Sequence, residues 1–163
     1  MPGQFTINET LNTLKAIFNN HKTERVCVIG TICVGKSTIL KRLSDYNCLD
    51  MDSELWPNIP PDEMELFSKL SQEPWTKEFG DEIDRLTYKY LKVKPGYPMF
   101  TSVIVDCEAV VYLDISDSLL TQHCEIRNVS FGDAKNIKEA IEDDWNNNKA
   151  KGDKTMYYVM LTE

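Results

Sequence analysis

Residues 29 to 38 read IGTICVGKST, and the apolar run Val26-Cys27-Val28-Ile29 leads directly into them. A short run that is apolar at every position is typical of a parallel strand buried on both faces. The segment that follows from Gly35, GKSTILKRLSDY, has the pattern of a helix. A buried strand, a glycine-containing loop and a helix in direct succession indicate an α/β domain.

The loop between this strand and helix matches G-x-x-x-x-G-K-[ST] at every fixed position. In this motif successive backbone N–H groups wrap a phosphate, and glycine is needed where the chain bends tightly or crowds the ligand. The first N–H groups and the dipole of the following helix also face the anion. We therefore predict a nucleoside triphosphate site that comprises Gly30, Thr31, Ile32, Cys33, Val34, Gly35, Lys36, Ser37 and Thr38.

Two side chains of the motif have specific expected roles. Lys36 is expected to reach the β- and γ-phosphates, and the hydroxyl of Ser37 is expected to bind Mg²⁺. The predicted ligands are therefore ATP, or another nucleoside triphosphate, together with Mg²⁺. The alternative interpretation is a degenerate loop that no longer binds a nucleotide.

The rest of the chain alternates helical and strand-like patterns. Helices are predicted at about 6–20, 61–71, 74–92, 117–127 and 133–147, and further strands at 47–51, 97–105, 109–116 and 155–161. This alternation predicts a largely parallel sheet. We expect residues 1–163 to form one domain, with the helix at 6–20 preceding a nucleotide-binding core from about 25 to 163.

One connection conflicts with a parallel sheet. If SVIVD and VVYLD are both strands, only Cys107-Glu108-Ala109 joins them, whereas a parallel crossover normally needs a dozen or more residues. Either the first strand ends near Thr101 and the remaining residues form a tight crossover, or the two strands form an antiparallel hairpin. We favour the tight crossover.

An acidic pair, Asp50 and Asp52 in LDMD, lies at the C-terminal end of the second predicted strand. In an open α/β sheet ligands bind beyond the carboxyl ends of the strands. Alternate residues of an extended segment share a face, so both carboxylates are expected to point into one cleft. One would hold Mg²⁺ through water, and the other would accept a hydrogen bond from the hydroxyl that receives a phosphoryl group. Alternatively both are solvated loop acids, or Asp52 caps a turn that begins SELW.

Taken together, the segments GTICVGKST, LDMDSEL and VVYLDIS resemble shikimate kinase and its relatives among the small P-loop kinases. This group is similar to the nucleoside-monophosphate kinases, and the resemblance covers about residues 25 to 128. It implies a P-loop NTPase fold, a three-layer α/β/α sandwich with a five-stranded, largely parallel sheet. It also implies phosphoryl transfer from ATP to a hydroxyl or phosphate acceptor.

Carried over by position, the resemblance assigns roles to individual side chains. Lys36 would hold the phosphates, while Ser37 and Asp50 would hold Mg²⁺. Asp52 would bind and orient the acceptor hydroxyl, Arg85 would bind the acceptor, and Arg127 would be a lid arginine beside the transferring phosphate. On this basis Lys36, Asp52 and Arg127 are the predicted catalytic residues. The alternative for both arginines is a surface or helix-end charge.

Three segments depart from the family pattern. Thr101-Ser102-Val103 replaces a glycine triplet that lines the acceptor pocket of shikimate kinases, which disfavours shikimate itself. The lid segment QHCEIRNVSFGDA holds one arginine, where relatives usually hold more. Relatives also have a helix after the last strand, and the helix at 6–20 is expected to pack in its place.

Composition excludes several classes of protein. A net charge of −8 disfavours a broad nucleic-acid surface. Five scattered cysteines without a C-x-x-C pair, and only two histidines, disfavour a disulfide framework or a zinc site. No apolar run approaches the length of a membrane span, and MPGQFTINET lacks the features of a signal peptide. We therefore expect a cytoplasmic protein without a membrane partner.

The leading hypothesis is a small-molecule kinase whose partners are a nucleoside triphosphate and a small acceptor. Only four arginines are present, which favours a neutral or singly charged acceptor. A polynucleotide 5′-hydroxyl kinase and a non-catalytic, regulatory nucleotide-binding protein are the alternatives. The residues do not name the acceptor, choose between ATP and GTP, or define the oligomeric state.

Overall fold

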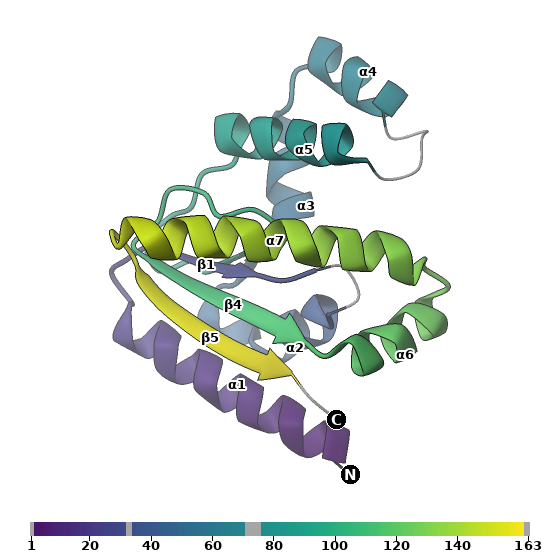
Figure 1. Ribbon diagram of the computed structural model, residues 1–163. Coiled ribbons are helices and arrows are strands. Elements are labelled where there is room, and N and C mark those ends of the chain that lie inside the picture. The colour runs from purple at the N-terminus through teal and green to yellow at the C-terminus, as the bar shows by residue number, and fades with distance from the viewer. Residues whose placement is uncertain (1, 32–33, 71–75, 162–163) are drawn as a thin grey trace.

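A five-stranded parallel sheet forms the centre of the computed structural model, which describes residues 2–31, 34–70 and 76–161 (Figure 1). The strand order is β2-β3-β1-β4-β5, and every neighbouring pair is parallel. The strands are β1 (Val26–Ile29), β2 (Leu49–Asp50), β3 (Met99–Thr101), β4 (Ala109–Ile115) and β5 (Thr155–Leu161). The predicted α/β class with a parallel sheet is confirmed.

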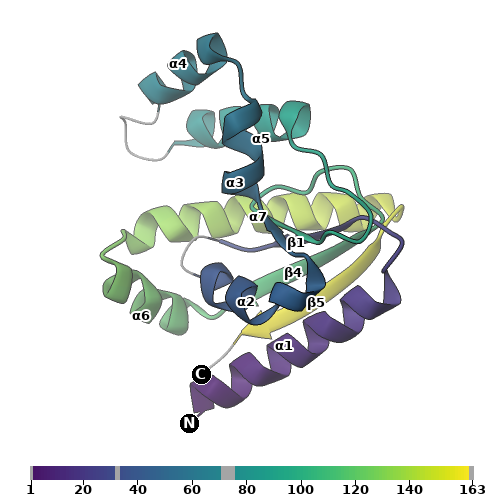
Figure 2. The ribbon, with the colours of Figure 1, turned by 180° about the vertical axis from the view of Figure 1, so that it is seen from behind.

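Helices cover both faces of the sheet, as a three-layer arrangement requires. α1 and α2 pack on one face, and α3, α5 and α7 pack on the other, where α7 crosses the strands (Figures 1 and 2). The helices are α1 (Pro2–Asn20), α2 (Lys36–Arg42), α3 (Met51–Leu55), α4 (Pro61–Leu70), α5 (Lys77–Tyr90), α6 (Asp117–Arg127) and α7 (Phe131–Lys151). Two short 3₁₀ helices, η1 (Ser44–Tyr46) and η2 (Trp56–Asn58), interrupt the loops.

The central strand β1 has the bounds that its apolar run predicts. All four of its residues are buried. Side chains alternate between the faces of a strand, so Val26 and Val28 enter the core beneath α1 and α2, while Cys27 and Ile29 enter the core beneath α5 and α7. An apolar residue at every position is therefore what a strand covered on both faces needs.

Two helix boundaries differ from the predictions. α1 begins at Pro2, so the predicted start at residue 6 lies inside the helix. α7 is capped by Ser130, whose hydroxyl accepts a hydrogen bond from the backbone N–H of Asp133 at 3.3 Å. Asp133 is thus in the first turn, and α7 extends to Lys151 because Gly152 ends it in the left-handed conformation.

The N-terminal helix packs beside the last strand. α1 runs along β5 in both views (Figures 1 and 2), and its side chains Leu14 and Phe18 are buried in the same core as Leu161 of β5. The apolar spacing in residues 11–18 therefore matches the face that α1 turns to the sheet.

The connection between β3 and β4 is a tight crossover, as we favoured. β3 ends at Thr101, and β1 lies between β3 and β4, so these two strands are not a hairpin. Residues 102–108 make the crossing, and at about 3.3 Å per residue they can span roughly 23 Å. Strand β1 is short, so this reach is enough to return along it and move two strand positions across.

The crossover is buried and held at both ends. Val103, Ile104, Val105 and Cys107 are buried, and the N–H of Ile104 donates to a carboxylate oxygen of Asp144 on α7 at 3.0 Å. A largely buried irregular segment thus occupies the place where a crossover helix would normally pack.

Two further observations concern membrane-spanning helices and cysteines. In the described ranges, no helix combines the length and the hydropathy needed to cross a membrane. Cys27, Cys48, Cys107 and Cys124 are free thiols.

Candidate functional site

The two glycines of the phosphate-binding motif each occupy a position that a larger residue would disturb. A Cβ on Gly30 would lie 3.1 Å from the carbonyl oxygen of Leu113 and 3.1 Å from a methyl group of Val34. Gly35 has φ +106°, in the region that L-residues rarely adopt, and apart from its chain neighbours no atom of the described residues lies within 4 Å of its Cβ position. The loop therefore passes close to β4 and then enters α2 with open space beside Gly35. Ile32 and Cys33, two of the predicted loop contacts, lie outside the described residues.

The remainder of the loop is anchored in the protein interior. The buried hydroxyl of Thr31 donates to the backbone oxygen of Ala134 on α7 at 2.6 Å. The N–H of Val34 donates to the backbone oxygen of Thr31 at 3.3 Å, and the side chain of Val34 is fully buried. Removal of one partner from a buried hydrogen bond of this kind lowers the free energy of unfolding by about 1–3 kcal/mol. The loop shape is therefore held by contacts on its inner side.

Lys36 is the first residue of α2 and lies near two carboxylates. Its side chain is half-buried. Burial lowers the pKa of Lys36 most strongly, the charges of Asp50 and Asp52 raise it, and the charge of Arg127 lowers it further. None of these groups forms an ion pair with Lys36 in the described part of the chain. Its ammonium group is thus close to both acids and has no ion-pair partner among the described residues. Ser37 and Thr38 follow it and are exposed.

The acidic pair does not lie in one extended segment, and this expectation is wrong. β2 ends at Asp50, and α3 begins at Met51, so Asp52 is in the first turn of a helix. The side chain of Asp52 accepts a hydrogen bond from the indole N–H of Trp56 at 3.0 Å and does not cap a turn. The chain turns into a helix because Met51 and Leu55, four residues apart, are both buried against the sheet.

A cavity of about 610 Å³ connects these residues, and both carboxylates of the acidic pair line it. Lys36, Asp50, Asp52 and Ser102 contribute from the carboxyl ends of β1, β2 and β3. The opposite walls are α5 and α7, and the apolar part of the lining comes from Met51, Trp56, Ile83, Ile137 and Ile141. The cavity therefore lies at the sheet edge where open α/β proteins bind their ligands.

The lining of this cavity is strongly acidic, with seven carboxylates against the two lysines Lys36 and Lys77. The acids are Asp50 and Asp52 after β2, Asp81 and Asp84 on α5, and Glu139, Asp143 and Asp144 on α7. Burial, followed by the charges of Asp144 and Asp81, raises the pKa of Asp84 to about 6. Burial also raises the pKa of Asp144 and, together with Asp52, that of Asp50. The carboxylates thus repel one another across the cavity.

This repulsion predicts a measurable gain in stability for Asp84→Asn. The pKa of Asp84 rises from 3.8 to about 6 on folding, so the folded state binds the proton more tightly and stability is lost as the pH rises through this window. At pH 7 we expect the variant to be more stable by about 1 kcal/mol, discounted for solvent at this half-buried position. That gain corresponds to roughly 2–4 °C in Tm.

Thermal denaturation followed by circular dichroism at pH 7 and at pH 4 checks this prediction. The gain should disappear at the lower pH, where the wild-type carboxyl is protonated. Asp62→Asn, on the exposed first turn of α4, is the matched control and should change little. A gain that does not depend on pH, or a loss at pH 7, would contradict the electrostatic explanation.

The two arginines predicted from the family resemblance lie outside the cavity lining. Arg85 is exposed on α5, with guanidinium nitrogens 2.5 Å from a carboxylate oxygen of Glu82 and 3.1 Å from one of Glu63. The structure therefore does not bring Arg85 to the acidic pair. Arg127 is exposed at the end of α6, close enough to Lys36 to affect its pKa. The predicted lid segment is helical except for residues 128–130.

The predicted Mg²⁺ contacts, Ser37 and Asp50, remain predictions. Among the described residues no group of three or more His, Cys, Asp and Glu side chains is arranged to hold a metal ion. In nucleotide sites Mg²⁺ takes one or two protein ligands and completes its shell with phosphate oxygens and water. A hydroxyl and one carboxylate at the start of α2 and the end of β2 fit that limited role.

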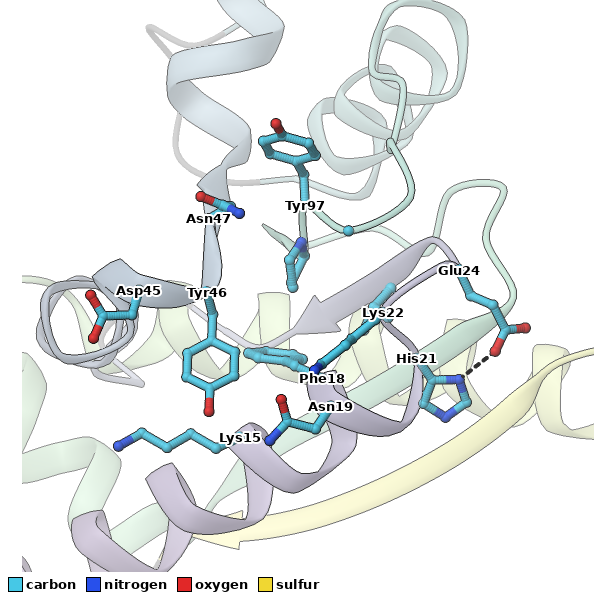
Figure 3. Close-up of a pocket in the computed structure, with 13 residues that line it drawn as sticks. Lys15, Phe18, Asn19, His21, Lys22, Glu24, Asp45, Tyr46, Asn47 and Tyr97 are labelled. Atoms are coloured by element: carbon cyan, nitrogen blue, oxygen red, sulfur yellow. Dashed lines mark hydrogen bonds and ion pairs between the residues drawn. The ribbon is translucent and has the colours of Figure 1, made fainter.

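A second cavity, of about 690 Å³, lies at the amino ends of the strands (Figure 3). Lys15 and Phe18 of α1 and Tyr46 of η1 line it, together with Tyr97 before β3. His21 at its rim is 2.8 Å from a carboxylate oxygen of Glu24 and 2.8 Å from the hydroxyl of Tyr157. Although larger, this cavity contains no residue of the phosphate-binding motif or the acidic pair, so we do not assign the predicted chemistry to it.

The acidic residues of α7 were missed by sequence reasoning. Asn136, Glu139, Asp143 and Asn147 line the cavity at helical intervals and form one polar stripe. Lys135 and Lys138 of α7 face elsewhere, since Lys138 contacts Asp114 and Asp117, and Lys135 contacts Asp117. The sequence did contain a signal for this stripe, because its acidic residues have no lysine four positions later to pair with them.

Neither a protein-family model nor a curated protein matches this sequence. The motif and the geometry of the cavity are therefore the features that indicate a function.

Proposed function

We propose that this protein is a P-loop phosphotransferase that moves the γ-phosphoryl group of a nucleoside triphosphate to a hydroxyl group of a small acceptor. The observation that carries the proposal is that Lys36 of the phosphate-binding motif and the acidic pair line the same cavity. A phosphate donor site and a carboxylate that can orient an acceptor are thereby adjacent. This adjacency is what phosphoryl transfer needs beyond nucleotide binding.

The motif supports the donor half of the site. Gly35, with its left-handed backbone and open Cβ position, leaves room for a phosphate beside the first residues of α2. Lys36 has no ion-pair partner in the described ranges and is available to hold the β- and γ-phosphates. Mg²⁺, held by the hydroxyl of Ser37 and through water by Asp50, would neutralise charge on the phosphate oxygens.

Asp52 supports the acceptor half. Its carboxylate lines the cavity, and the indole of Trp56 fixes one of its oxygens at 3.0 Å. The other oxygen is available to accept a hydrogen bond from an acceptor hydroxyl, align it with the γ-phosphate, and take its proton as the new O–P bond forms. The bond between the γ-phosphorus and the bridging oxygen breaks, and the nucleoside diphosphate leaves. Arg127 would approach the transferring group from the end of α6.

Measurement of nucleotide binding and of turnover tests this proposal. A non-hydrolysable ATP analogue with Mg²⁺ should raise the Tm, because a ligand at a hundredfold excess over its Kd stabilises the folded state by about 2.7 kcal/mol. ADP release from Mg-ATP, followed by a coupled assay, should then increase when a suitable hydroxylated acceptor is added. Parallel reactions with GTP identify the preferred donor.

Two results would point to another function. Tight Mg-nucleotide binding without transfer or hydrolysis across neutral, cationic and anionic acceptors would favour a regulatory nucleotide-binding protein. Phosphorylation of a 5′-hydroxyl oligonucleotide would favour a polynucleotide kinase. The absence of nucleotide binding would contradict the assignment of the loop itself.

A further inference from the structure

We infer that the acceptor is a hydroxylated amine, a small molecule that carries ammonium groups as well as the hydroxyl that receives the phosphoryl group. This inference depends on the proposed function, because it names the substrate class of the same cavity. It is carried by two observations: an approximately 610 Å³ cavity that Lys36 itself lines, and the excess of carboxylates in its walls.

The acids beside Lys36 are only part of the negative charge in the cavity. Asp50 and Asp52 lie next to Lys36, where Asp50 would serve the bound Mg-nucleotide and Asp52 the acceptor hydroxyl. The other acids lie on the two walls beyond it, Asp81 and Asp84 on α5 and Glu139, Asp143 and Asp144 on α7. Among the described residues that line these walls, Lys77 is the single cation. The part of the cavity left for an acceptor therefore carries a net negative charge.

Among the described residues, no lysine or arginine forms an ion pair with any of the five wall acids. Lys135 and Lys138 of α7 pair with Asp117 of α6 instead, and Lys151 acts on Asp144 only through its charge, which lowers the pKa of that carboxyl. Three of these acids line the cavity and are exposed to solvent, namely Asp81, Glu139 and Asp143. Unpaired carboxylates on opposite walls would attract an ammonium group and repel a carboxylate or phosphate.

The apolar part of the cavity lining agrees with a compact acceptor. Trp56, Ile83 and Ile137 supply an apolar surface beside the acids, which suits the carbon skeleton of a ring while its substituents face the carboxylates. Anionic acceptors, including nucleoside monophosphates and polynucleotide ends, would place their charge against the same carboxylates. The cavity thus favours an amine that also carries hydroxyl groups.

Three cyclohexane polyols of similar size test the inference because they differ mainly in charge. 2-Deoxystreptamine carries two ammonium groups, myo-inositol is neutral, and quinate is a carboxylate. Each is added to the full-length protein with Mg²⁺ and a non-hydrolysable ATP analogue for isothermal titration calorimetry, and with Mg-ATP for ADP release. We expect the diamine to bind most tightly and quinate most weakly, and the preference for the diamine to fall as salt is added.

A double variant links the preference to the cavity walls. Asp81→Asn with Asp143→Asn should reduce affinity for the diamine roughly tenfold and leave that for myo-inositol nearly unchanged. Asp62→Asn with Asp153→Asn removes the same charge from exposed positions that do not line the cavity, and should have little effect. An equal loss in both double variants would show a general effect of net charge and overturn the inference.

The outcomes separate this inference from the proposed function. Turnover with quinate or a nucleoside monophosphate at least equal to that with the diamine would overturn the acceptor class and leave the kinase proposal standing. Binding of the diamine that depends on Asp81 and Asp143, without ADP release, would support the cavity specificity and count against phosphoryl transfer. No binding of the diamine would overturn the inference.

Discussion

Replacement of Lys36 by methionine is expected to reduce phosphoryl transfer by at least about a hundredfold, the usual cost of removing one charge-stabilising group from a transition state. Methionine retains most of the length and apolar character of the lysine stem, so the half-buried position of Lys36 stays filled. The ammonium group that would hold the β- and γ-phosphates is lost. Because burial disfavours a charge at this position, the fold should not become less stable.

Turnover and nucleotide affinity are measured for this variant beside Lys41→Met. Lys41 lies on the same helix, is exposed, and does not line the cavity. The control should keep wild-type turnover, and both variants should melt near the wild-type Tm. Undiminished transfer by Lys36→Met would exclude the P-loop assignment, whatever the fold resembles.

Much of the fold followed from the sequence because each strand carries a local signal. β1 and β5 have the predicted bounds, since short apolar runs between polar breaks define them. The tight crossover at residues 102–108 could be stated only as one of two alternatives. Which of the two connections forms depends on the position of β1 between β3 and β4, and that strand order is a property of the whole sheet.

The nucleotide site stays a prediction from its motif, whereas the walls of the cavity and the backbone around Asp52 depend on tertiary packing. The loop from Gly30 to Ser37 was readable because glycine and lysine have fixed chemical roles there. Asp52 was expected in an extended segment because alternation was given more weight than the spacing of Met51 and Leu55, which are both buried on one side of α3.

The two walls of the cavity illustrate the limit of local patterns. Asp81 and Asp84 on α5, and Glu139 and Asp143 on α7, are far apart in the chain and look like ordinary solvated helix faces. Only the packing of α5 and α7 brings them to one cavity. Arg85 was assigned to the acceptor by resemblance, although Glu82 stands three residues before it and binds it in the structure.

Asp52→Asn is expected to abolish most of the transfer while nucleotide binding stays largely intact. A positioned general base contributes about 10²–10⁴-fold to such a reaction. Asparagine keeps the oxygen that accepts the hydrogen bond from Trp56, so the geometry of α3 should be preserved. It cannot take a proton, and its amide presents a donor where the acceptor hydroxyl needs an acceptor.

The loss should therefore fall on kcat, and the KM for the nucleotide should change little, because Asp52 is assigned to the acceptor and not to the phosphates. Glu54→Gln is the matched control, since Glu54 lies on the same short helix but does not line the cavity. Equal losses in both variants would indicate that α3 has been disturbed. Full transfer by Asp52→Asn would remove Asp52 from the chemistry and leave the acceptor hydroxyl to be oriented by another wall of the cavity.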